Sequence, residues 1–262
     1  MDAAAHFRQE ARAFHAAARR AAKAGDAPPV PSCPEWTMTD LVFHLAGVHR
    51  FVIAIIRDRL DGPPDPAELA KAELPADTEG WPVPGRTPTH GPIPPTLLDA
   101  FQEGAERLET LFKERSPGDP VWTWSEDHTV GFWLRMQTIE AAVHRWDAEN
   151  AVGDPGPIHE EIAVDAVTQT FEVMAPARRA WQSAPPGSGE RFRFVRTDGP
   201  GEWVVRFDGE HVRLGGRAAH VELAGTASDL MLFLWRRIPA DALDVQGDKT
   251  VLDRYFDLVP PI

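Results

Sequence analysis

Two side chains with metal-binding chemistry lie four residues apart in the segment EAAVHRWDAE. Glu140 and His144 therefore share one face of any helix that this segment forms. On a helical wheel of about 100° per residue, Trp133 and Val143 fall within about 60° of Glu140, so the pair lies in an apolar stripe. A buried carboxylate is costly unless it is paired or bound to a metal ion. The spacing predicts either a metal site or a hydrogen-bonded pair at a helix edge.

A further imidazole lies in the apolar segment TMTDLVFHLAGVHRFVIAIIRDRL, which predicts a helix over residues 37–60. His44 lies within about 60° of the centre of its apolar stripe, whereas His49 lies nearer the edge. We therefore expect His44 to be the inward imidazole, because facing helices of a bundle often build metal sites from inward Glu and His residues. The residues that define the stripe are Leu41, Leu45, Val48, Phe51, Val52, Ile55 and Ile56.

Together, His44, Glu140 and His144 would supply two nitrogens and one oxygen. That donor set suits Zn²⁺ with one coordination position left open, and Ni²⁺ or Fe²⁺ also fits it. An open position is typical of a catalytic rather than a structural metal. Asp147, one turn beyond His144, is placed to orient the imidazole of that ligand.

Four helical segments, predicted at residues 2–24, 37–60, 95–115 and 129–151, would position these residues. Thr37 and Asp40 form a capping box at the start of the second segment. Residues 61–94 are rich in proline and predict a long loop. Four helices with these connections predict a helical bundle.

The pattern changes after the bundle. A fifth helix is predicted over residues 158–181, and RFRFVRTD, EWVVRF and HVRLGG then alternate apolar and polar residues, as strands do. Asp208 and Gly209 predict a hairpin turn, and ASDLMLFLWRRI predicts another helix. The predicted fold class is α+β. It consists of a four-helix bundle over residues 1–155 and a small C-terminal α/β domain over residues 156–262.

The charge, the cysteine content and the apolar segments of the chain bear on its partners and its location. The net charge is −13, with 27 basic against 40 acidic residues, which disfavours nucleic acid and anionic membranes as partners. The single cysteine, Cys33, excludes a disulfide framework and favours the cytoplasm, and we expect it to pack rather than react. The N-terminus lacks the apolar core of a signal peptide, and no stretch approaches the roughly 18 apolar residues of a membrane span.

The segments CPEWTMTDLVFHLAGVHR (33–50) and EAAVHRWDAENAVG (140–153) together resemble the two signature segments of the mycothiol-dependent maleylpyruvate isomerase family, whose bundles are DinB-like. LAGTASDLMLFLWRRIPADALDVQGD (223–248) is similar to the family's C-terminal domain. The resemblance implies an up-down four-helix bundle with a divalent metal, usually zinc, on His44, Glu140 and His144. It also implies a catalytic arginine at Arg237, although Arg236 occupies a position where the family usually has glycine.

The resemblance further implies that mycothiol, the low-molecular-weight thiol of actinobacteria, is the cofactor. Its sulfur would bind the open metal position, become a thiolate, and add to an electrophilic carbon of the substrate. Two enzymatic outcomes are consistent with this chemistry: cis–trans isomerisation of a maleylpyruvate-like substrate, or thiol S-transfer to another electrophile. A metal-bearing ligand-binding or sensor protein without turnover and a thiol-independent metal hydrolase are the alternatives. The substrate, the native metal and the oligomeric state stay open at this level.

Overall fold

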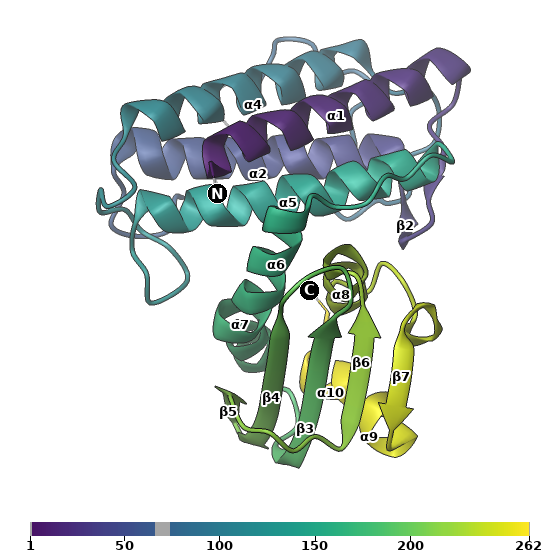
Figure 1. Ribbon diagram of the computed structural model, residues 1–262. Helices are drawn as coiled ribbons and strands as arrows, with labels where there is room; N and C mark the ends of the chain where they lie inside the picture. The colour runs from purple at the N-terminus through teal and green to yellow at the C-terminus, as the bar shows by residue number, and fades with distance from the viewer. Residues whose placement is uncertain (1, 66–73, 262) are drawn as a thin grey trace. The chain divides into compact units, whose positions relative to one another are not determined.

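The computed structural model describes residues 2–65 and 74–261. The chain divides into two compact units, Met1–Gly156 and Pro157–Ile262. The first unit is built from long helices and the second contains a five-stranded sheet, so the predicted α+β class is confirmed (Figure 1).

Four long helices build the described part of the first unit (Figure 1). Helix α1 packs against α4 and α5, and α2 packs against the same two helices. Each helix begins and ends within two residues of its predicted bounds, and the arrangement confirms the up-down bundle. The four helices are α1 (Ala3–Ala24), α2 (Met38–Asp58), α4 (Pro95–Glu114) and α5 (Val130–Ala151).

The start of α2 is fixed by Asp40. Its Oδ2 accepts hydrogen bonds from the Thr37 backbone N–H at 2.9 Å, from Thr37 Oγ1 at 3.0 Å and from the Thr89 backbone N–H at 2.9 Å. Thr89 belongs to the predicted loop 61–94, whose described parts, 61–65 and 74–94, contain no helix; residues 66–73 lie outside the described residues. This capping arrangement holds α2 in place one turn before His44.

A short hairpin precedes α2 and was not predicted. Its strands are β1 (Pro29–Val30) and β2 (Cys33–Thr37), paired with Val30 opposite Cys33. The side chain of Val30 is fully buried in the bundle core, and Met38 N–H donates to the carbonyl of Pro28 at 2.9 Å. The strands are too short and too rich in proline for the alternation that marks a strand in sequence.

Helix α5 is buried almost all the way round, including the side that carries Arg145. Arg145 is only 5% exposed. Its guanidinium donates to Glu10 from α1 at 2.8 Å, to Glu149 at 2.7 Å and to the carbonyl of Gly156 at 2.8 Å. Because α1 covers this side of α5, a charge there is tolerated only through complete pairing.

Helix α2 is long and apolar enough to cross a membrane by length and composition alone, contrary to the expectation that no stretch approaches a membrane span. Most of its apolar side chains are buried inside the bundle. A central helix of a bundle needs this composition for packing.

The second unit begins with a continuous helical segment made of α6 (Glu160–Gln169), a π-helical turn (Thr170–Met174) and α7 (Ala175–Trp181). The sheet has the order β5-β4-β3-β6-β7; β3 and β6 are parallel and the other neighbours are antiparallel. Gly209 turns the predicted β4–β5 hairpin with a φ of 57°. The remaining elements are β3 (Gly187–Arg196), β4 (Glu202–Gly209), β5 (His211–Leu214), β6 (Val221–Gly225), α8 (Ala227–Leu234), a 3-10 turn (Ala240–Ala242), β7 (Asp244–Gly247), α9 (Lys249–Asp253) and α10 (Tyr255–Leu258).

Phenylalanines of the central strand anchor the helices to the sheet. Phe192 and Phe194 alternate with half-buried arginines along β3 and are fully buried. Phe194 lies 5.1 Å from Phe171 of the π-helical turn, and Phe192 lies 5.1 Å from Tyr255 of α10, measured between ring centroids. This apolar face of the sheet is the core of the second unit.

Candidate metal centre

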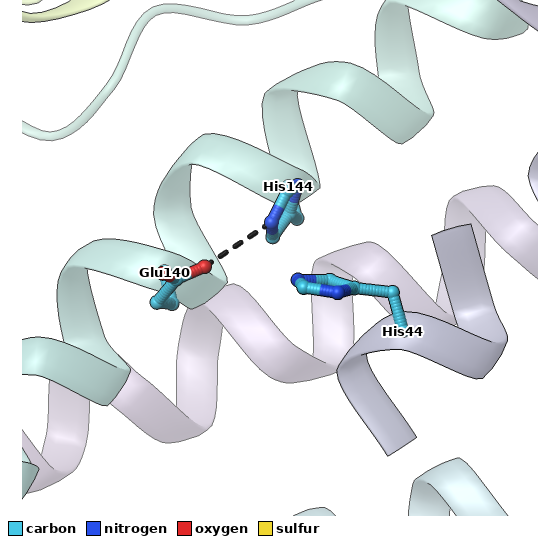
Figure 2. Close-up of side chains that lie close together, drawn as sticks. All are labelled: His44, Glu140 and His144. Atoms are coloured by element: carbon cyan, nitrogen blue, oxygen red, sulfur yellow. Dashed lines mark ion pairs between the residues drawn. The ribbon is translucent and has the colours of Figure 1, made fainter. Parts of the chain in front are cut away.

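The structure brings His44, Glu140 and His144 together inside the bundle. Each offers one ligand atom, and these atoms all lie within 4.8 Å of one another. Figure 2 shows His44 extending from α2 toward Glu140 and His144, which lie one turn apart on α5. Two segments that are far apart in sequence therefore form one cluster.

His144 is held from both sides of its ring. Its Nε2 lies 3.1 Å from Glu140 Oε2, and its Nδ1 lies 2.8 Å from Asp147 Oδ2. Asp147 is fully buried, and its other oxygen accepts a hydrogen bond of 2.5 Å from Ser32 Oγ. A histidine that donates one ring N–H to a carboxylate presents its other nitrogen in a fixed direction, which is the usual arrangement of a metal-bound imidazole.

The electrostatic field at this cluster favours positive charge. Burial opposes protonation of His144, but hydrogen bonds and charge from Asp147 and Glu140 outweigh it and raise the pKa of His144. A metal cation would occupy the same negative environment as that proton.

The donor set fits a divalent cation. Ligand atoms of a tetrahedral zinc site lie about 3.3–3.5 Å apart, because each is roughly 2.0–2.2 Å from the metal. Side-chain shifts on the order of 1 Å would bring the cluster to that geometry. Glu140 and His44 are partly exposed, whereas His144 is buried. Two nitrogens and one oxygen, with two of the three residues partly exposed, match a metal site that keeps a position open.

The burial of the two imidazoles on α2 is the reverse of the wheel expectation. His49, which the wheel places near the edge of the apolar stripe, is only 1% exposed, whereas His44 is partly exposed. His49 packs against Phe7 of α1 and Phe101 of α4, at 5.6 and 5.2 Å between ring centroids. Because α2 contacts both α1 and α4 as well as α5, its buried arc is wider than the apolar residues alone indicate. The structure nevertheless brings His44, and not His49, into the cluster of possible ligands.

Two neighbours of the cluster were not assigned a role from sequence. Ser32 lies in the turn of the β1–β2 hairpin, and Trp36 of β2 lies 5.0 Å from the His44 ring. Trp36 falls inside the signature segment 33–50, but its position in the sequence does not indicate that it lies beside His44. Cys33, between them, packs against the core of the bundle as expected.

Three tryptophans pack with one another or with Phe132 at the start of α5 and in the loop before it. Trp122 and Trp133 lie 6.4 Å apart, and Trp133 Nε1 donates to the Trp122 carbonyl at 2.8 Å. Trp124 packs edge-on against Phe132 at 4.9 Å.

Arg237 belongs to the second unit, where it follows α8. Its Nη1 donates to the Trp235 carbonyl at 2.8 Å. Arg236 has a φ of 57°, in the left-handed region that favours glycine, and its guanidinium lies 5.0 Å from the centre of the Phe256 ring. Glycine, the residue that the family resemblance leads us to expect here, adopts that backbone conformation without strain.

Solved structures with the same fold support this architecture. The crystal structure of a mycothiol-dependent maleylpyruvate isomerase matches with a TM-score of 0.60 and 15% identity, over 94% of each chain. A histidine-to-alanine mutant of a mycothiol-dependent maleylpyruvate isomerase matches with a TM-score of 0.62 and 14% identity, over 94% of this chain and 93% of that one. No curated protein matches the sequence.

Family models cover both units. The mycothiol maleylpyruvate isomerase N-terminal domain matches residues 7–149, which include all three side chains of the cluster. The C-terminal domain of the same family matches residues 161–254, which include Arg237. The chain therefore belongs to the mycothiol maleylpyruvate isomerase family.

Proposed function

We propose that this chain is a metal-dependent enzyme that uses mycothiol to isomerise maleylpyruvate or a closely related cis-configured acid. Family membership supports the thiol and the substrate class. The observation that carries the metal is the convergence of His44, Glu140 and His144 from α2 and α5. Zn²⁺ is the first candidate, and Ni²⁺ and Fe²⁺ suit the same donors.

The residues of the bundle would hold and orient the cation. Asp147 accepts the Nδ1 proton of neutral His144, so the lone pair on Nε2 is directed toward Glu140 and His44. Glu140 contributes a negative charge that partly neutralises a divalent ion. When bound, the cation supplies an open position at which the pKa of a thiol falls enough to give a thiolate at neutral pH.

The isomerisation requires reversible addition of the thiol across the substrate double bond. Addition would leave a single bond about which the substrate can rotate, and elimination of the thiol would return the trans acid. The thiol is therefore regenerated in every turnover. We assign Arg237 to the substrate carboxylate or to the enolate-like charge that develops during addition, since a guanidinium can donate two parallel hydrogen bonds to such groups.

The other properties follow from this chemistry. The partners are a small thiol and a small electrophile, and neither nucleic acid nor a membrane is required. We further propose that the protein acts in the cytoplasm of an actinobacterium, which use of mycothiol and the lone Cys33 would support.

The test combines metal analysis with turnover. Purified protein should contain bound divalent metal and should convert maleylpyruvate to its trans isomer only when mycothiol is added, without net loss of thiol. His144→Ala should lose metal and activity, whereas His49→Leu, at a buried histidine outside the cluster, should retain both.

Other outcomes would replace the proposal. Consumption of one thiol for every substrate molecule would indicate S-transfer. Turnover without thiol would indicate a hydrolase, and tight ligand binding without product would indicate a sensor. Wild-type protein that contains no metal and takes none up from solution would overturn the metal assignment.

A further inference from the structure

The β1–β2 hairpin contacts both sides of the candidate metal cluster. Ser32, in its turn, donates to Asp147, which in turn holds His144 of α5. Trp36, on its second strand, lies beside the ring of His44 of α2, at 5.0 Å between centroids and 43° between planes. A single local element thus contacts the ring of His44 directly and reaches the ring of His144 through Asp147.

The hydrogen bond from Ser32 to Asp147 has the geometry of a strong hydrogen bond. Its O···O distance of 2.5 Å lies at the short end of the range for a hydroxyl that donates to a carboxylate, and the acceptor is fully buried. A carboxylate has two oxygens, and in Asp147 one is directed to Ser32 and the other to His144. With both oxygens engaged, the carboxylate plane cannot rotate freely, and the direction of His144 Nε2 is fixed with it.

The hairpin itself is well anchored, so Ser32 has a fixed position from which to act. Strand β1 contacts α5 and β2 contacts α2. Val30 is buried in the core, and the hairpin ends at Thr37, which Asp40 ties to the start of α2. Pro31, next to Ser32, restricts the backbone of the two-residue turn.

We propose that Ser32 is a positioning residue of the metal site: it holds Asp147 so that His144 meets the cation in a fixed orientation. The inference rests on the proposed function, because it requires that the cluster binds a metal. Ser32 touches neither the cation nor the substrate in this account. Its effect passes through Asp147.

The experiment measures Co²⁺ affinity of the purified full-length chain by visible absorbance, in competition with a chelator, and the melting temperature of the metal-free protein. Asp147→Asn, which changes the residue that holds a ligand, should weaken Co²⁺ binding by roughly 10- to 100-fold. Ser32→Ala should weaken it by roughly 10-fold, at the lower end of that range. Ser32→Thr, which retains the hydroxyl, should restore most of the affinity. Thr96→Val, which removes the hydroxyl that accepts from Trp81 Nε1 in the same unit, should leave it unchanged.

A double-mutant cycle separates positioning from general stability. If Ser32 acts through Asp147, Ser32→Ala should have little further effect on Co²⁺ affinity in the Asp147→Asn background. Equal effects in both backgrounds, or a lower melting temperature of the metal-free protein with unchanged Co²⁺ affinity, would overturn the inference. Co²⁺ binding by the wild-type chain separates this result from a failure of the proposed function. If the proposed function were wrong, the wild-type chain itself would bind no Co²⁺.

Discussion

His44 and His49 lie on the same helix, five residues apart, and meet different surroundings. His44 is partly exposed and shares a cluster with a second imidazole and a carboxylate. His49 is the more deeply buried of the two, and neither of its ring nitrogens has a hydrogen-bond partner among the described residues. Its neighbours are the rings of Phe7 and Phe101 and the backbone of Gly104.

The difference shows that depth of burial is a poor guide to chemical role. Desolvation by burial, together with the nearby His44, lowers the pKa of His49 to about 3, although Glu140 acts in the opposite direction. His49 is therefore a neutral ring that packs. At His144 the carboxylates of Glu140 and Asp147 reverse the effect of burial and raise the pKa. The groups around an imidazole decide whether its site attracts a cation.

The largest expected effect comes from removing a ligand. His144→Ala should lower affinity for Zn²⁺ or Co²⁺ by more than about 100-fold, because a direct donor is lost. This exceeds the loss expected for residues that only hold the ligands in place. The helical signal in far-ultraviolet circular dichroism should stay the same. Isothermal titration of metal into the metal-free protein measures the loss, and stoichiometric metal in this variant would refute the ligand assignment.

Acid should destabilise the wild-type protein partly through His49. The folded-state pKa of about 3 lies below the ordinary value of 6.5, so the unfolded chain binds an extra proton between these limits. Stability from the neutral ring is complete above pH 6.5 and is lost as the pH falls toward 3. The contribution is at most about 1.4 kcal/mol for each pH unit.

His49→Leu isolates this contribution, since it removes the titrating ring. Urea unfolding of both metal-free proteins between pH 7 and pH 4 should show a flatter decline in the variant. Parallel declines would mean that His49 does not titrate in this way.

At neutral pH the same variant should be slightly more stable than the wild type. The buried ring nitrogens of His49 lack partners, and replacing such a group by an apolar side chain of similar size removes a desolvation cost. Lost ring contacts with Phe7 and Phe101 offset part of the gain. We expect a net increase of about 1 kcal/mol in the free energy of unfolding. A loss above about 2 kcal/mol would point to an unrecognised partner of His49.

The second unit also buries a polar group that, like His49, has no hydrogen-bond partner among the described residues. Tyr255 is fully buried among phenylalanines, and its hydroxyl has no partner among the residues that the structure describes. Tyr255→Phe should raise the unfolding free energy by about 0.5–1 kcal/mol. A denaturant midpoint that falls instead would show that the hydroxyl is bonded in solution.

The cluster could be predicted from the sequence because helical spacing places its residues on the inward faces of two helices. Glu140 and His144 follow from spacing on one helix, and their pairing with His44 follows from two inward faces and from the family resemblance. The burial of His49 was misjudged, because the wheel was centred on apolar residues without knowledge of which helices cover α2. Ser32 was missed because nothing in the sequence links a hairpin turn to Asp147, which it meets only in the folded chain. Strands β6 and β7 were missed because they are short and lie between stronger helical signals.

The most direct test of His44 as a metal ligand compares bound metal in His44→Ala and His49→Leu, measured side by side after exposure to Zn²⁺ and removal of the excess. Each variant lacks one imidazole of α2, so the comparison separates the imidazole of the cluster from the imidazole that packs. We expect His49→Leu to retain metal at the wild-type level and His44→Ala to retain almost none. Equal retention by both, or loss from His49→Leu alone, would contradict this expectation.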